Sequence, residues 1–97
     1  MATYVVLSNF TEQGIRSVKD STKRADAVKE PAKRYGVTAK DFYWTLGSYD
    51  VVVVFDAPDD ASMTALGLAI GSLGNVRTQT MRAFSREEMN GILAKLG

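Results

Sequence analysis

A run of apolar residues without any alternation, Val51 to Phe55, is the feature that most constrains what this chain can fold into. The run is short and β-branched, which predicts a β-strand. A strand with one face in water alternates apolar and polar side chains, whereas this one is apolar on both faces. We therefore expect a strand in the middle of a sheet whose two faces are both covered.

Three further segments predict strands of the same sheet. They span Thr3–Phe10, Val37–Gly47 and Val76–Phe84. The turn Gly47–Asp50 is too short for a crossover, so the second of these strands forms an antiparallel hairpin with the valine run. The first strand is also apolar on both faces. In the second, the side chains expected to face the helices are Phe42, Trp44 and Leu46.

Helical periodicity predicts what lies between the strands. The segment from Thr11, a suitable N-cap, to Tyr35 places apolar residues at steps of three and four. Pro31 falls inside it, and we expect a kink or a short second helix beginning there. Gly36 is expected at the C′ position. The basic residues of this segment alternate with acidic ones, which is typical of a solvated helix surface.

A second helix is predicted from Asp59, as N-cap, to Gly74. Ser85 and Glu88 have the spacing of a capping box and begin a short terminal helix. The resulting order, β-α-β-β-α-β plus one helix, predicts an α+β ferredoxin-like fold. Residues 1–97 are expected to form a single domain with helices on one face of a four-stranded antiparallel sheet.

The second face of that sheet is apolar and has no helix left to cover it. The simplest cover is the same face of another copy. We therefore predict a homodimer or higher homo-oligomer in which two sheets stack as an α/β barrel. A monomer with a bare face, or one covered by the terminal helix, is the alternative.

Composition excludes several classes of chemistry. The chain has no cysteine and no histidine, so disulfides, thiolate nucleophiles, Fe–S clusters and the Ser-His-Asp triad are ruled out. Neither a metal nor another cofactor is expected, because Asp56, Asp59 and Asp60 lack the spacing of a cation-binding loop. The formal net charge of +1 gives no pull toward nucleic acid or membrane. With no signal peptide or membrane span in view, a cytoplasmic protein is expected.

An RNA-recognition domain shares this strand order and needs a separate test. Its third strand carries basic and aromatic residues on which bases stack. The corresponding residues here, Val51 to Phe55, are almost all valines. RNA binding is therefore not expected.

The second face also carries polar residues that could form a small-molecule pocket with apolar walls. If Tyr43 and Thr45 point to that face, alternation in the last strand can place Thr78, Thr80 and Arg82 beside them. Arginine could hold a carboxylate or phosphate, and tyrosine could donate a hydrogen bond. In the alternative, Arg82 only pairs with Asp50 or Asp41. The predicted ligand-binding residues are Tyr43, Thr45, Tyr49, Asp50, Arg77, Thr78, Thr80 and Arg82.

Two stretches, Tyr43–Asp60 and Gly74–Phe84, resemble the GYD-domain family, as does the early Gly14–Arg24. Pro31 departs from the helix-forming character usual in that region. The resemblance implies a small bacterial or archaeal protein of the dimeric α/β-barrel type. It implies no activity, but it directs attention to Gly47 and to most of the residues just listed.

Three functions fit the sequence. The first is a non-catalytic oligomeric module that binds a small anionic or aromatic molecule on the sheet. The second is a cofactor-independent enzyme, of the oxygenase or isomerase type, that uses a tyrosine or aspartate as its base in a dry cavity. The third is a purely structural assembly protein whose interior is filled by side chains.

Overall fold

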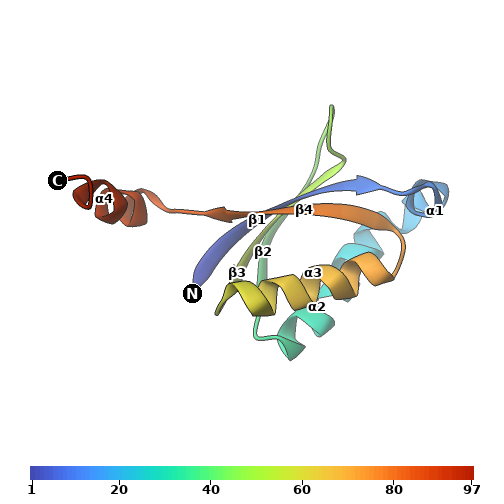
Figure 1. The fold of residues 1–97 in the computed structure, drawn as a ribbon. Coiled ribbons are helices and arrows are strands. Elements are labelled where there is room, and N and C mark those ends of the chain that lie inside the picture. The colour runs from blue at the N-terminus through green and yellow to red at the C-terminus, as the bar shows by residue number, and fades with distance from the viewer.

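The computed structural model describes residues 1–97 and has the predicted order of elements (Figure 1). The strands are β1 (Ala2–Phe10), β2 (Thr38–Trp44), β3 (Val51–Ala57) and β4 (Val76–Ala83). The helices are α1 (Glu12–Arg16), the 3-10 turn η1 (Val18–Asp20), α2 (Ser21–Arg34), α3 (Asp60–Ser72) and α4 (Arg86–Ala94). The strands form one antiparallel sheet in the order β2-β3-β1-β4, which is the ferredoxin-like order. No helix is long and apolar enough to cross a membrane.

One face of the sheet is covered by α2 and α3, and we call it the covered face (Figure 1). Tyr4 lies opposite Phe55, and Val6 lies opposite Val53, at the centre of this face. All four side chains are buried. They pack with a set of residues from the two helices, Ala32, Met63 and Leu66, to form the core.

The other face, which we call the open face, has no helix of this chain on it (Figure 1). Val5 lies opposite Val54, and Leu7 lies opposite Val52, so the centre of this face is also apolar. These side chains are only half-buried, by their neighbours in the sheet. The two central strands are therefore apolar on both faces, as predicted. This chain covers only one of the two faces of the sheet.

The first helical segment is divided at Ser17 and not at Pro31, so the prediction of a new helix at Pro31 was wrong. Helix α2 continues through Pro31 to Arg34. The proline lies in the last turns of α2, where its missing N–H removes only one hydrogen bond before the helix ends. The end is a Schellman motif at Gly36, whose φ is 72°, and the N–H of Val37 donates to the carbonyl of Ala32. Gly36 therefore has its predicted place.

The β2–β3 hairpin is held by hydrogen bonds to its own backbone and to that of β1. Gly47 has a φ of 103°, which favours glycine at the tip. The Thr45 hydroxyl donates to the carbonyl of Tyr49 at 2.6 Å, and the Asp50 carboxylate accepts from the N–H of Phe10 at 2.9 Å. Leu46 was predicted to face the helices, but it lies in this loop and is completely exposed, because β2 ends at Trp44.

Helix α4 begins with the predicted capping box between Ser85 and Glu88. It covers neither face of the sheet and extends beyond β4, away from the rest of the chain (Figure 1). One side of α4 and the residues just past its C-terminal end carry three apolar side chains, and all three are exposed: Met89, Leu93 and Leu96. The molecule is consequently elongated, with a longest dimension of 52 Å.

Gly14 is the position where a side chain would be least tolerated. A Cβ there would lie 1.9 Å from the carbonyl oxygen of Asn75, a backbone atom. We expect Gly14→Ala to lower the free energy of unfolding by about 1–3 kcal/mol through overpacking. Gly67→Ala is the matched control, because no atom lies within 4 Å of its Cβ and alanine favours the helix interior. Chemical denaturation measures the free energy of unfolding of both variants, and equal values for the two would contradict the prediction.

Candidate functional site

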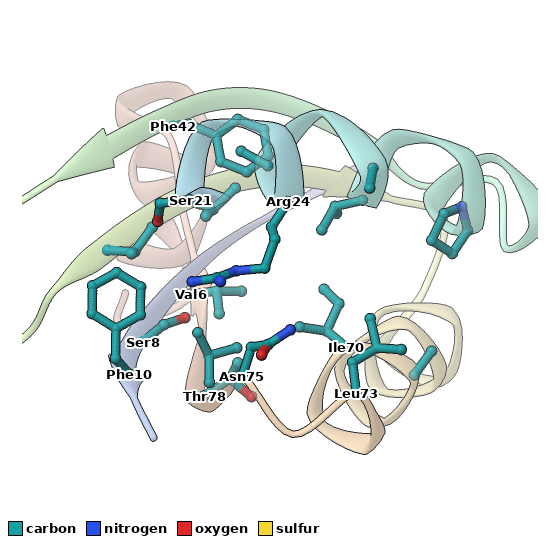
Figure 2. A pocket seen from close by; sticks show the side chains of 18 of the residues that line it. Val6, Ser8, Phe10, Ser21, Arg24, Phe42, Ile70, Leu73, Asn75 and Thr78 are labelled. Atoms are coloured by element: carbon teal, nitrogen blue, oxygen red, sulfur yellow. The ribbon is translucent and has the colours of Figure 1, made fainter. Parts of the chain in front are cut away.

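A pocket of about 300 Å³ lies between the covered face of the sheet and the two long helices (Figure 2). The sheet forms its floor through Val6, Val51 and Val53, and α3 contributes Ile70. Helix α2 forms the opposite wall with Val28 and neighbouring apolar side chains of the same helix. The pocket is therefore mainly apolar and lies on the face opposite to the one where the sequence predicted a ligand.

The polar groups of this pocket gather toward the end where β1 finishes. Ser8 is buried, and it lies opposite Thr78 in the sheet. Asn75 and Ser21 lie at the same end, and the indole N–H of Trp44 donates to the Ser21 hydroxyl at 3.1 Å. No aspartate or glutamate lines the pocket, and Arg24 is its single charged residue.

Arg24 extends from α2 into the pocket (Figure 2). Its Nη1 donates to the backbone carbonyl of Ser17 at 2.9 Å and to the Ser17 hydroxyl at 3.0 Å. Its Nη2 donates to the carbonyl of Gly14 at 3.2 Å, and the guanidinium lies 5.9 Å from the centre of the Phe10 ring. All these acceptors are neutral, so the positive charge has no carboxylate partner.

A second group of polar residues surrounds Arg82 at the other end of the covered face. Its guanidinium lies 4.5 Å from the centre of the Phe84 ring and 5.7 Å from that of Tyr4. The Tyr4 hydroxyl donates to the Asp60 carboxylate, and this hydrogen bond raises the pKa of Tyr4. A tyrosine that holds its proton in this way is a poor general base.

Arg82 also pairs with the capping box of α4. Its Nη2 lies 3.1 Å from a carboxylate oxygen of Glu88. The backbone N–H of Ser85 and the Arg82 guanidinium both donate to that carboxylate and lower the pKa of Glu88. The alternative in which Arg82 pairs with Asp50 or Asp41 was therefore wrong, and Arg82 instead ties the end of β4 to α4.

The predicted ligand-binding residues do not gather on one face. Tyr43 lies opposite Val52, and Arg77 lies opposite Asn9, so both belong to the open face. Tyr49 reaches the same face, where its hydroxyl donates to Gln79 at 2.9 Å. Thr45 is hydrogen-bonded to the hairpin backbone, and Asp50 is hydrogen-bonded to the backbone at the end of β1.

The remaining three predicted residues lie on the covered face. Thr78, Thr80 and Arg82 face the same way as Ser8, Val6 and Tyr4, their partners on β1. Side chains alternate along a strand, so a register that differs by one residue reverses the face of every one of them. The prediction that these three residues lie beside Tyr43 was wrong, because it assumed the other register.

Sequence reasoning missed Arg24, Ser21 and Ser8. Arg24 was assigned to a solvated helix surface together with the other basic residues of the segment. A usable indication was Ser8, which interrupts the apolar positions of β1 on the covered face. A buried hydroxyl in such a row marks a place where a polar group of another element comes near.

The fold is an α+β fold with ferredoxin-like strand order, and the profile of the GYD domain matches residues 4–93. The chain belongs to the GYD-domain family. It is 34% identical over 84 residues to a Thermus thermophilus protein named "Glutamine synthetase and cystathionine beta-lyase binding protein". That alignment covers 86% of this chain and 88% of the relative.

The lowered pKa of Glu88 leads to a prediction about α4. A carboxyl group whose pKa is lower in the folded state stabilises the fold above its ordinary pKa, and this contribution is lost as the pH falls through the lowered value. We expect the Glu88 carboxyl carbon to titrate below the ordinary glutamate value in an NMR pH series. Arg82→Ala should raise this pKa partway toward the ordinary value, because the hydrogen bond from Ser85 remains. Arg77→Ala, a control on the same strand, should leave it unchanged, and an unshifted Glu88 in the wild type would contradict the assignment.

Proposed function

We propose that this chain is a self-associating, non-catalytic protein-binding module, in which the open faces of two copies pack together and the pair binds a metabolic enzyme. The observation that supports it best is the open face itself. Its centre is made of Val5, Leu7, Val52 and Val54, and no other part of the chain covers them. An apolar sheet surface of this kind is typical of an interaction site.

The occupant of the open face is taken to be a second copy because of the chemistry of that face. Its central residues are neutral and aliphatic, so the face is complementary to itself, as a two-fold interface requires. Two such sheets stack at about 10 Å with their side chains interdigitated. Charged and amide side chains, among them Arg77 and Asp56, lie toward the ends and edges of the face, as in the polar rim of an interface.

The size of the face suggests that α4 takes part as well. Four strands at about 4.8 Å and some seven residues at about 3.4 Å give a footprint of roughly 450 Å². A stable interface buries about 800 Å² per partner, so sheet stacking alone provides about half of that area. Helix α4 extends beyond the sheet with Met89, Leu93 and Leu96 exposed, and these side chains can pack on the other copy.

The second part of the proposal is the partner. The relative that carries the name "Glutamine synthetase and cystathionine beta-lyase binding protein" matches nearly the whole of this chain. We extend the class of partner, an enzyme of nitrogen or sulfur metabolism, to this protein. A pair built on the open faces would present its helices outward on both sides, which leaves both helical layers free for a partner.

Small-molecule binding on the sheet is a second candidate for the open face. The contact between Tyr49 and Gln79 crosses this face, and Tyr43 and Arg77 lie on it. In the proposed pair these side chains would lie at the interface, where Arg77 could hold an anion. Catalysis is less well supported, because Asp60 raises the pKa of Tyr4 and so opposes its use as a base.

Val52→Asp tests self-association. Val52 lies between Leu7 and Tyr43, so a carboxylate there stays hydrated in a single copy but is buried without a partner in the pair. We expect the dissociation constant to rise at least a hundredfold, measured by sedimentation equilibrium. Leu68→Asp, a change at an exposed position of α3, is the control and should leave the constant unchanged. A wild-type protein that sediments as a single copy would refute the pair.

The partner is tested separately with purified enzymes. We expect the wild-type protein, immobilised on a biosensor, to bind glutamine synthetase or cystathionine β-lyase from its own organism with a Kd in the micromolar range or below. An unrelated enzyme of similar charge is the control. Binding to neither enzyme would reject this class of partner, while the sedimentation result would still decide self-association on its own.

A further inference from the structure

The pocket between the helices and the covered face is too large to be an ordinary packing defect. Protein interiors have few voids larger than a water molecule, which occupies about 30 Å³ in the liquid. A pocket of about 300 Å³ is roughly twice the volume of an engineered cavity of about 150 Å³ that binds benzene, so it has room for roughly a dozen heavy atoms. It also lies on the face of the sheet opposite to the open face, so neither self-association nor Tyr43 and Arg77 would use it.

We propose that this pocket binds a medium-chain aliphatic carboxylate, with its carboxylate on Arg24 and its alkyl chain along the core. This assignment does not depend on the proposed pair or on its enzyme partner. It rests on three properties of the pocket, which are its apolar lining, its one unpaired cation and the separation of the two along the strands.

The charge of the lining selects an anion. Arg24 is the single charged residue of the pocket, and no acidic residue is present to neutralise it. Its three hydrogen bonds go to neutral oxygens of Ser17 and Gly14, so at most three of its five N–H groups are used. An incoming carboxylate would gain charge-assisted hydrogen bonds from the remaining donors.

The neighbours of Arg24 favour the same charge. Ser21 is the first residue of the 14-residue helix α2, and its side chain lines the pocket. The preceding residue, Asp20, makes no side-chain cap to this helix, so no carboxylate neutralises its N-terminus through a capping hydrogen bond. The positive end of the helix dipole therefore adds to the field of Arg24 at this end of the pocket.

The apolar part of the lining selects a hydrocarbon chain of medium length. Strand register orders the pocket along its length, with Phe10 beside Arg24 at one end and Phe55, opposite Tyr4, at the other. Six residues separate these levels, which is about 20 Å at 3.4 Å per residue. Toward the Phe55 end the walls are Val28, Val53 and other hydrophobic side chains. A single cation balances the one negative charge of a carboxylate, and the apolar walls accommodate an alkyl chain. A phosphate fits less well, because one arginine would not balance its higher charge.

The experiment uses the one tryptophan of the chain as its reporter. Trp44 lines the polar end of the pocket, so a ligand should change its fluorescence. We expect sodium decanoate, titrated below its micelle-forming concentration, to give a saturable change, with decanol and decylamine binding at least tenfold more weakly. 2-Bromodecanoate should quench Trp44 more strongly than 10-bromodecanoate, because the bromine of the former lies next to the carboxylate.

Two variants separate the roles of charge and space. Arg24→Gln should weaken decanoate binding at least tenfold, while Lys23→Gln, a change at the exposed neighbouring position of α2, should not. Ala69→Phe should abolish binding by filling the pocket with Arg24 still present. Thermal unfolding without ligand verifies that each variant is folded, and an unfolded Arg24→Gln would leave the decision to Ala69→Phe and the ligand series.

Each of the other outcomes overturns the assignment. Equal binding of decanoate and decanol would show an apolar pocket with no role for charge. No binding to the wild type would show a pocket that closes by collapse of the helices. Binding that appears only after removal of residues 86–97 would show that α4 of another copy is the occupant. Val52→Asp should keep decanoate binding, so failure of self-association and failure of this site are distinguished.

Discussion

The pairing of β1 with β3 on one side and with β4 on the other places apolar side chains on both faces of the sheet at its centre. Two helices of thirteen and fourteen residues lie against one of these faces. The burial of Tyr4, Phe55 and their neighbours stabilises this side of the molecule through the hydrophobic effect. The same register leaves Val52 and Val54 without a cover, so the features that build the core also create the surface for association.

The fold was largely predictable because its determinants are local. Capping residues Thr11, Asp59 and Ser85 each accept the hydrogen bond that their spacing predicts. Gly36 and Gly47 have the positive φ values that their turns require. Alternation and short turns then leave only a few ways to order four strands. In each of these cases the physical cause acts within a few residues of the chain.

The candidate site was less predictable because it depends on contacts between distant residues. The face on which Thr78 and Arg82 lie follows from the register of β4 against β1, and a period of two gives no preference for either register by itself. Arg24 was indistinguishable from its basic neighbours, since only its contacts with Ser17 and Gly14 turn it into the pocket. Composition and periodicity contain no information about such contacts.

The position of Arg24 in the pocket has its origin at Ser17, where the first helical segment is divided. In a continuous helix, the carbonyls of Gly14 and Ser17 would accept from the N–H groups four residues later, and Arg24 would have no acceptor on that side. The break between α1 and α2 instead brings both carbonyls within reach of Arg24, which donates to each of them, and the Ser17 carbonyl also accepts from the N–H of Asp20. The guanidinium is thereby satisfied enough to lie against Phe10 without any counter-ion, yet its charge is still uncompensated. The division of the helix is therefore what converts an ordinary basic residue of α2 into the cation of an apolar pocket.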